Sequence, residues 1–190
     1  MAVRFDAVIL AGGRGSRLGG VSKPELEVDG RRLLDAALAA ASGAERTVVV
    51  GDVGVPDGVT RVREDPPFGG PVAGLEAGLL ALGAGSAPWT LVLASDLPDA
   101  EAAVTALLAT DPADHDGACL LDADGRLQWL LGCYRTPMLA TRLAARGGIT
   151  AMCRLLEPLD LLGVAGAAAS TVDLDTPDDI AAWTARGGEQ

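Results

Sequence analysis

The chain has 190 residues, 49% of them hydrophobic, and a formal net charge of -11 at pH 7. That length and composition predict a single domain over residues 1–190 with one substantial core. The acidic charge argues against a surface for nucleic acid or an anionic membrane, because such a surface needs a basic face, so any site for an anion has to be local.

The first predicted element is a short apolar strand over residues 7–10, which runs directly into a glycine-rich loop. The loop carries the cations Arg14, Arg17 and Lys23 and has glycines at positions 12, 13, 15, 19 and 20. Glycine lets backbone N–H groups approach an anion closely, because no Cβ stands in the way and positive φ costs little. A strand followed by such a cationic loop predicts a phosphate-binding site.

Two better-known phosphate loops do not fit this stretch. A Walker A loop needs Gly-Lys followed by Ser or Thr, whereas Lys23 stands between Ser22 and Pro24. A dinucleotide fingerprint would need a third glycine where the chain has Leu18. Lys23 is the only lysine in the chain, and a lysine ammonium is a compact charge that fits between phosphate oxygens. The alternative is that Lys23 is an ordinary surface lysine.

The rest of the chain alternates predicted strands with predicted helices. Apolar and β-branched runs predict extended segments at 26–28, 47–50, 59–62, 89–94, 117–121, 127–134 and near 170–174. Helical periodicity predicts helices at 31–42, 71–82, 100–109, 138–145, 150–156 and 177–185. Residues 163–169 are rich in small side chains and carry no predicted element. This alternation predicts the α/β class: a three-layer α/β/α Rossmann-like sandwich whose mixed sheet is mostly parallel, with antiparallel pairing toward the C-terminus.

Acidic side chains lie at the ends of two predicted strands. Asp96 follows the strand at 89–94, and Asp173 and Asp175 lie at the end of the strand near 170–174. Carboxylates that converge at one edge of a sheet, beside bound phosphates, would make a site for Mg²⁺. Each acidic group could instead cap the helix that follows it.

The other reactive residue types point away from covalent catalysis. His115 is the sole histidine and lies in a polar loop, so a relay through histidine is not expected. Cys119, Cys133 and Cys153 are widely spaced without a CxxC pair, which predicts buried thiols in a reducing cytoplasm and neither a disulfide framework nor a zinc site. The start of the chain leaves no room for a signal peptide, and no apolar run approaches the about 18 residues of a membrane helix.

The stretch from Leu10 to Leu26, LAGGRGSRLGGVSKPEL, resembles the signature of the nucleotidyltransferase superfamily that includes the MobA-type molybdenum cofactor guanylyltransferases. The resemblance covers nearly the whole chain, because later segments extend it: Glu64-Asp65, Gly70-Pro71-Val72-Ala73-Gly74, Ala94-Ser95-Asp96-Leu97-Pro98 and Asp173-Leu174-Asp175-Thr176-Pro177. The chain departs from the family pattern at six positions. It has Leu18 where the family has Met, Ser22 where it has Asp, Gly51 where Asn is usual and Ser95 where it has Cys, and it has Asp173 and Asp175 where the family often has Asn.

The resemblance implies transfer of GMP from Mg-GTP to the phosphate of molybdopterin, with release of pyrophosphate. It implies Arg17, Lys23 and Asp96 as catalytic residues, and Asp96 with Asp175 as ligands of Mg²⁺. The implied nucleotide-binding residues are Leu10, Ala11, Gly12, Gly13, Gly15, Lys23, Gly51, Asp65, Gly74 and Asp96. GTP is expected over CTP, because LAGG with GPxAG resembles the guanylyl branch of the family.

Three alternatives stay open: a cytidylyltransferase of the same pathway, another small-substrate nucleotidyltransferase, and a non-catalytic nucleotide-binding relative, which Ser22 in place of Asp would favour. The expected partners are GTP and molybdopterin, with other molybdenum cofactor biosynthesis proteins and apo-molybdoenzymes as candidates, and neither nucleic acid nor membrane. Arg135, Arg146 and Arg154 are candidates for binding the acceptor phosphate. We expect a monomer in the cytoplasm.

Overall fold

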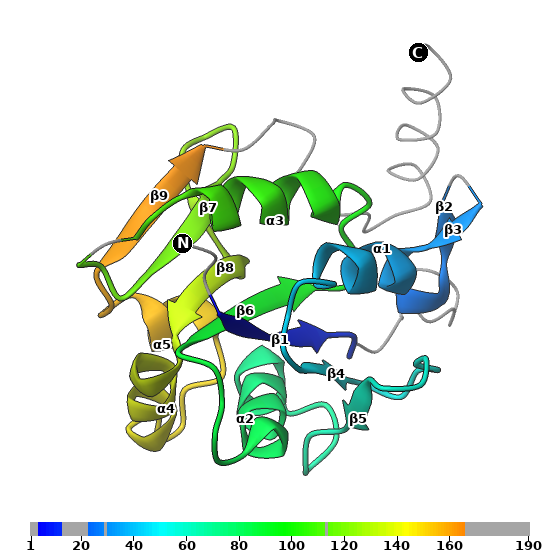
Figure 1. The fold of residues 1–190 in the computed structure, drawn as a ribbon. Helices are drawn as coiled ribbons and strands as arrows, with labels where there is room; N and C mark the ends of the chain where they lie inside the picture. Colours follow the sequence, from blue (N-terminus) through cyan, green and yellow to red (C-terminus); the bar gives the residue numbers. More distant parts are fainter. Residues whose placement is uncertain (1–3, 13–22, 29, 113, 166–190) are drawn as a thin grey trace.

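The computed structural model describes residues 4–12, 23–28, 30–112 and 114–165 (Figure 1). Its strands are β1 (Phe5–Leu10), β2 (Glu27–Val28), β3 (Arg31–Arg32), β4 (Thr47–Val50), β5 (Thr60–Val62), β6 (Trp89–Ala94), β7 (Gly117–Leu121), β8 (Leu127–Arg135) and β9 (Leu161–Ala165). Its helices are α1 (Leu33–Ala40), α2 (Pro71–Leu82), α3 (Ala100–Ala109), α4 (Thr136–Ala144) and α5 (Met152–Leu156), with a short 3-10 helix at Lys23–Glu25. No helix within these ranges is long and apolar enough to cross a membrane.

Seven of the strands form one sheet in the order β5-β4-β1-β6-β8-β7-β9. Neighbouring strands are parallel except around β8, which runs antiparallel to both β6 and β7. Helices α1 and α3 cover one face of this sheet, and α2, α4 and α5 cover the other (Figure 1). The predicted three-layer sandwich with a mixed, mostly parallel sheet is therefore confirmed.

The central strands are apolar on both faces because helices cover both faces. The three valines of β4 are at most 2% exposed, and their β-branched side chains suit a strand that is buried on both sides. β1 also buries Asp6 completely, and its carboxylate accepts hydrogen bonds from Arg46 Nη2 and from the Ala87 N–H, each at 2.8 Å. These bonds hold the amino-terminal edge of the parallel strands together.

Helix α2 lies close to the sheet because glycines face it. A Cβ on Gly74 would come 3.2 Å from Leu10 Cδ2, and one on Gly78 would come 2.5 Å from Val8 Cγ1. Pro71 occupies the first turn, where its missing N–H costs nothing. The bounds of α2 are those predicted from the sequence, 71–82. The bounds of β4, β6, β7 and α3 also match the predicted ones.

Two predictions in the described part of the chain are wrong in kind. The helix predicted at 31–42 begins at Leu33, because Arg31–Arg32 pairs with Glu27–Val28 as a two-stranded antiparallel ribbon. The segment 163–169, predicted to carry no element, contains the end of β9, which pairs in parallel with β7. The prediction of a buried thiol is also wrong for Cys153, which is exposed on α5, whereas Cys119 and Cys133 are buried as predicted.

Other predicted bounds differ only slightly. β8 extends one residue further than predicted, α4 begins at Thr136, and α5 begins at Met152. The strand predicted near 170–174 and the helix predicted at 177–185 lie outside the described residues.

Candidate nucleotide-binding site

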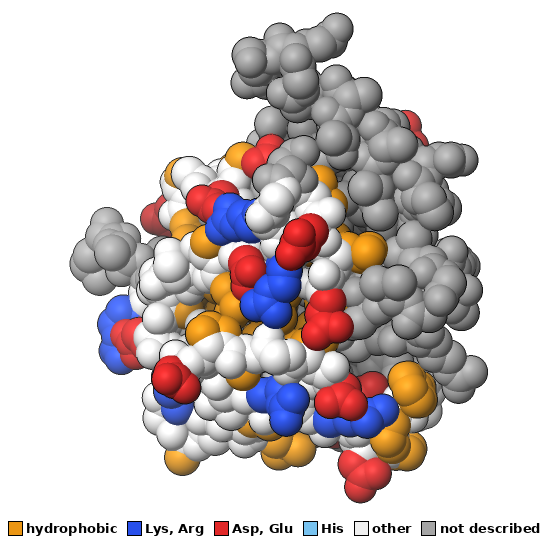
Figure 2. Space-filling model, turned by 90° about the vertical axis from the view of Figure 1, so that its right-hand side faces the viewer, with side chains coloured by type: hydrophobic (Ala, Val, Ile, Leu, Met, Phe, Trp, Pro, Cys, Tyr) orange, Lys and Arg blue, Asp and Glu red, His pale blue; other side chains and the backbone are white. Residues whose placement is uncertain are grey.

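Four parallel strands, β5, β4, β1 and β6, end at the same edge of the sheet. The chain passes from β1 to β4 through α1 on one face, and it reaches β6 on the other side of β1 through α2 on the opposite face. This reversal is a topological switch point, and open α/β sheets bind ligands in the crevice beyond it. Figure 2 faces this edge and shows acidic and basic side chains interspersed on it.

Backbone hydrogen bonds hold the turns at this edge against one another. Ala11, Gly51 and Ser95 are the first residues beyond β1, β4 and β6. Each donates its N–H to the carbonyl of the last residue of a neighbouring strand, at 2.8, 2.9 and 3.2 Å respectively. The edge is therefore a set of fixed main-chain turns that present their peptide groups side by side.

Gly51 marks the closest approach between two of these turns. A Cβ at this position would lie 2.6 Å from the Ala11 carbonyl oxygen and 2.8 Å from the Ala11 carbonyl carbon, and φ is +157°. Only a residue without a side chain fits here unless the turns move apart. The structure thus brings Leu10, Ala11, Gly12 and Gly51 to one place, and their contact with a nucleotide stays a prediction.

The loop after β5 reaches the β1 turn through Glu64. Its two carboxylate oxygens lie 3.9 and 4.0 Å from the position that a Cβ on Gly12 would take, and Oε1 accepts the Phe68 N–H at 3.0 Å. Glu64 is half-buried, whereas Asp65, the residue singled out from the sequence, is exposed. Sequence reasoning missed the Glu64 contact because it joins segments that are far apart in the chain.

Helix α2 begins at this same edge of the sheet. Gly70, with φ +85°, leads into its first turn, and the amino-terminal end of a helix favours negative charge. Gly74, predicted to contact the nucleotide, is buried one turn further in, against the side chains of Leu10 and Val50. Its lack of a side chain therefore serves helix–sheet packing directly behind the β1 turn.

Asp96 follows β6 and lies half-buried at the switch point. The alternative that Asp96 caps the next helix is wrong, because the N-cap position of α3 is Asp99. Within the described ranges there is no group of three or more His, Cys, Asp or Glu side chains that could hold a metal ion. Mg²⁺ commonly binds through one or two carboxylates together with substrate phosphates, so a single carboxylate at this position fits that ion.

Several predicted site residues cannot be placed, because they lie outside the described residues: Gly13, Gly15, Arg17, Asp173 and Asp175. Lys23 begins the 3-10 helix, which lies against α1. The roles of these five residues and of Lys23 stay predictions.

Of the arginines considered for an acceptor phosphate, Arg135 lies at the edge of the sheet opposite the candidate site. It pairs in register with Trp89 at the amino-terminal end of β6, and its guanidinium lies 4.7 Å from the centre of that ring. Arg146 forms an ion pair with Glu76 at 2.6 Å, and Arg154 is exposed on α5. The hypothesis for Arg135 is therefore wrong.

A buried network supports β8, and no sequence pattern predicted it. The Tyr134 hydroxyl donates to the Trp129 carbonyl oxygen at 2.7 Å and lies 2.8 Å from Cys119 Sγ. Burial raises the pKa of the Cys119 and Cys133 thiols to about 12 and also raises the pKa of Tyr134, so all three groups are neutral at pH 7. The network lies where the pairing of β7 with β8 shifts register.

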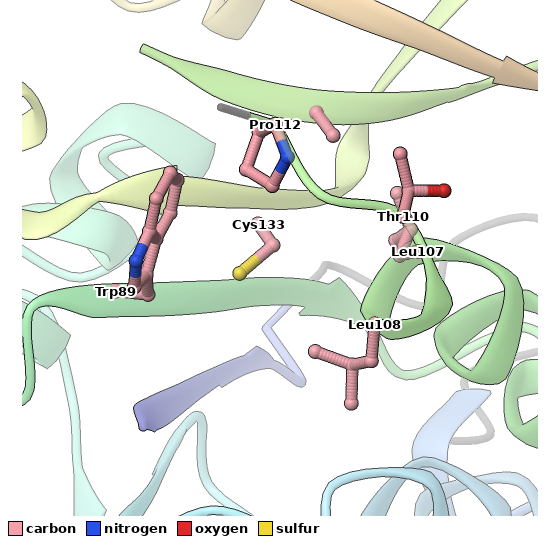
Figure 3. A pocket seen from close by; sticks show the side chains of 7 residues that line it. Trp89, Leu107, Leu108, Thr110, Pro112 and Cys133 are labelled. Carbon is pink, nitrogen blue, oxygen red and sulfur yellow. The ribbon is translucent and has the colours of Figure 1, made fainter. Parts of the chain in front are cut away.

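A small apolar pocket lies between α3 and the strands β6, β7 and β8, with the Cys133 thiol and Trp89 among its lining (Figure 3). Its lining residues are Trp89, Leu107, Leu108, Thr110, Pro112, Ala118 and Cys133. The pocket lies beside the start of β6, away from the glycine turns, and its almost wholly apolar lining does not suit a nucleotide.

The arrangement of strands, switch point and glycine turns is the fold of a nucleotidyltransferase. The solved structure of a nucleotidyl transferase from Methanothermobacter thermautotroptrophicus has the same fold, with a TM-score of 0.75 over 96% of this chain and 97% of that chain, at 23% sequence identity.

The model of the MobA-like NTP transferase domain matches residues 7–161, and the chain belongs to this family. A molybdenum cofactor guanylyltransferase from Acidiphilium cryptum (strain JF-5) is 41% identical over 113 residues, which span 56% of this chain and 58% of that protein. Another from Pseudomonas syringae pv. syringae (strain B728a) is 30% identical over 166 residues, or 80% of this chain and 78% of that protein. The resemblance inferred from the sequence is confirmed.

Proposed function

We propose that the chain transfers GMP from GTP to the phosphate of molybdopterin, releasing pyrophosphate and forming molybdopterin guanine dinucleotide. The observation that carries this proposal is the meeting of the β1, β4, β5 and β6 turns at a switch point, in a chain whose relatives are molybdenum cofactor guanylyltransferases. Monomeric state and a cytoplasmic location stay predictions.

The transfer needs positioning and charge neutralisation, because the acceptor phosphate oxygen itself attacks the α-phosphorus of GTP and pyrophosphate leaves. The turn formed by Leu10, Ala11 and Gly12 would hold the nucleotide through its backbone, with Gly13 and Gly15 continuing the cradle. Arg17 and Lys23 would neutralise the triphosphate. The protein contributes no nucleophile to this scheme.

Asp96, together with Asp175, would hold Mg²⁺. When bound, this ion would neutralise negative charge on the phosphates. The half-buried position of Asp96 beside the switch point suits a hard cation that also binds substrate oxygens. Asp65 and the turn of residues 70–74 would lie near the base, as the family resemblance implies, and Gly51 would bind the nucleotide.

The acceptor would approach from the side of β8 and β7. The turn between these strands lies at the same edge as the nucleotide turns, because β7 and β6 run in the same direction on either side of β8. Beside that turn, the side chain of Gln128 in β8 donates to Asp122 Oδ2 at 2.9 Å. Hydrogen bonds from the backbone N–H of Arg126 and Asp124 lower the pKa of Asp122.

A pyrophosphate-release assay with Mg²⁺, a molybdopterin source, and either GTP or CTP tests the proposal. We expect turnover with GTP, little with CTP, and none without the acceptor. Faster turnover with CTP would instead identify a cytidylyltransferase. Nucleotide binding without turnover would identify a non-catalytic relative.

A further inference from the structure

We propose that Tyr134 is a positioning residue for the acceptor: its hydroxyl holds a bulge of β8, residues 128–131, in place beside the turn that carries Asp96. This inference rests on the proposed function and deepens it, because it names the residue that fixes the acceptor side of the site. It is carried by two hydrogen bonds of the buried hydroxyl and by the strand register on both sides of β8.

The bulge is a break in the pairing of β7 with β8. Cys119 pairs with Gly132, but Leu121, two residues further along β7, pairs with Leu127, five residues back along β8. Residues 128–131 of β8 therefore stand opposite the single residue Leu120. Bulges are common next to active sites, where they change the direction in which side chains point.

The other neighbour of β8 places the bulge at the edge of the candidate site. Toward the carboxyl end of β6, the last pair between β6 and β8 joins Leu93 with Leu131. β6 itself ends one residue later, at Ala94, and the turn with Asp96 follows. The bulge is therefore the part of β8 that adjoins this turn, on the side from which the acceptor would approach.

One side chain ties the bulge to the regular part of the sheet. Tyr134 is fully buried, and its hydroxyl donates to the Trp129 carbonyl oxygen, inside the bulge, at 2.7 Å. The hydroxyl has one proton, so its contact with Cys119 Sγ at 2.8 Å is a hydrogen bond that the thiol donates. Two consecutive hydrogen bonds therefore join the bulge of β8 to β7, in a buried place where losing a partner is costly.

Gly132 leaves the room that the tyrosine ring needs. Residues two apart in a strand share a face, so the Tyr134 ring lies along β8 over Gly132 toward Trp129. A side chain at position 132 would meet both the Tyr134 hydroxyl and Cys119 Sγ. Because the ring is fully buried, it does not touch a substrate, and it acts only through the main chain of the bulge.

Steady-state kinetics of pyrophosphate release, with molybdopterin and GTP varied in turn, test the inference on the whole chain. Tyr134→Phe removes the hydroxyl and keeps the ring. We expect KM for molybdopterin to rise roughly three- to tenfold, which is what the loss of one neutral hydrogen bond is worth, while kcat changes less. Kd for GTP, measured by calorimetry, should stay within about twofold of wild type, because the nucleotide turns belong to other strands.

Thr90→Val is the matched control. Thr90 pairs in register with Tyr134 and is also fully buried, but its hydroxyl lies 2.9 Å from that of Thr136 and does not reach the bulge. It should lower the melting temperature about as much as Tyr134→Phe does and leave KM for molybdopterin unchanged. Deuterium exchange, followed by mass spectrometry, should become faster in residues 127–131 for Tyr134→Phe alone.

The proposal is overturned if Tyr134→Phe keeps the wild-type KM for molybdopterin, if Thr90→Val raises that KM equally, or if GTP binding weakens as much as acceptor use. Unchanged deuterium exchange in residues 127–131 also overturns it, because the hydroxyl would then not hold the bulge. All of these results would leave the guanylyl transfer standing. A wild-type protein that releases no pyrophosphate from GTP in the presence of molybdopterin would instead overturn the proposed function.

Discussion

Replacing Gly51 by alanine should separate the turns that form the nucleotide edge. The new Cβ would lie 2.6 Å from the Ala11 carbonyl oxygen. Since an ordinary contact between carbon and oxygen begins near 3.4 Å, the Ala11 turn would have to retreat by about 0.8 Å. Ala11 is only 4% exposed, and its N–H is bonded to Val50 O at 2.8 Å, so it has little freedom to retreat.

The expected cost follows from these contacts. Forcing a methyl group into a packed site costs about 1–3 kcal/mol, and an unfavourable φ adds about 1 kcal/mol or more. We therefore expect the free energy of unfolding in urea to fall by about 2–4 kcal/mol, and the melting temperature by roughly 5–15 °C for a chain of this size. GTP affinity should fall roughly 10- to 100-fold, because the β1 turn would no longer be in place.

Gly54→Ala is the matched control, since nothing lies within 4 Å of the Cβ that it would add. It should stay within about 0.5 kcal/mol of the wild-type stability and keep GTP affinity. If Gly51→Ala behaves like Gly54→Ala in both urea denaturation and calorimetry, then the two turns are not held together as the structure indicates, and the reasoning is refuted.

Four further predictions address Lys23, Asp96 and the thiols. Lys23→Ala should keep the fold but lose about 2–4 kcal/mol of transition-state stabilisation, which is roughly 30- to 1000-fold in the pyrophosphate-release rate; a wild-type rate would make Lys23 an ordinary surface lysine. Asp96→Asn should melt within a few degrees of wild type yet need far more Mg²⁺ for activity, because it loses a negative charge beside the ion; lower stability with an unchanged Mg²⁺ requirement would mark Asp96 as structural. Ellman's reagent at pH 8 should react rapidly with exposed Cys153 alone, because Cys119 and Cys133 are buried and burial raises their pKa to about 12; fast reaction of all three thiols would contradict their placement. Because the folded chain holds these two protons more tightly than the unfolded chain, whose thiols titrate near 9, the free energy of unfolding should fall as pH rises from about 9 toward 12.

The elements whose bounds the sequence predicted correctly are those with strong local signals. β4 is an unbroken β-branched run, and α2 has a proline in its first turn and a glycine at its end. β9 was missed because Gly163 and the small residues around it weaken the strand pattern, and its pairing with β7 becomes visible only in three dimensions. β2 lies within the extended segment predicted at 26–28, whereas β3 falls at the start of a predicted helix, because a two-residue strand carries almost no periodicity.

The features of the candidate site also fall into those that could be predicted from the sequence and those that could not. The glycine turn after β1 and the aspartate after β6 could be found from the sequence, because each follows an apolar strand directly. The contact of Glu64 with Gly12 could not be found, since it depends on how far β5 lies from β1 across the sheet. The position of Arg135 at the opposite edge of the sheet could not be predicted either, because it depends on the antiparallel direction of β8.

The reversed direction of β8 separates the chain segments that serve the two proposed substrates. The nucleotide turns come from β1, β4, β5 and β6, whereas the β7–β8 hairpin arrives at the same edge from a later part of the chain. Hairpin turns at a surface accept changes of length and sequence with little effect on the strands that carry them. The acceptor side of this enzyme could therefore diversify, or be exchanged in the laboratory through residues 122–126, while the machinery for the nucleotide is inherited intact.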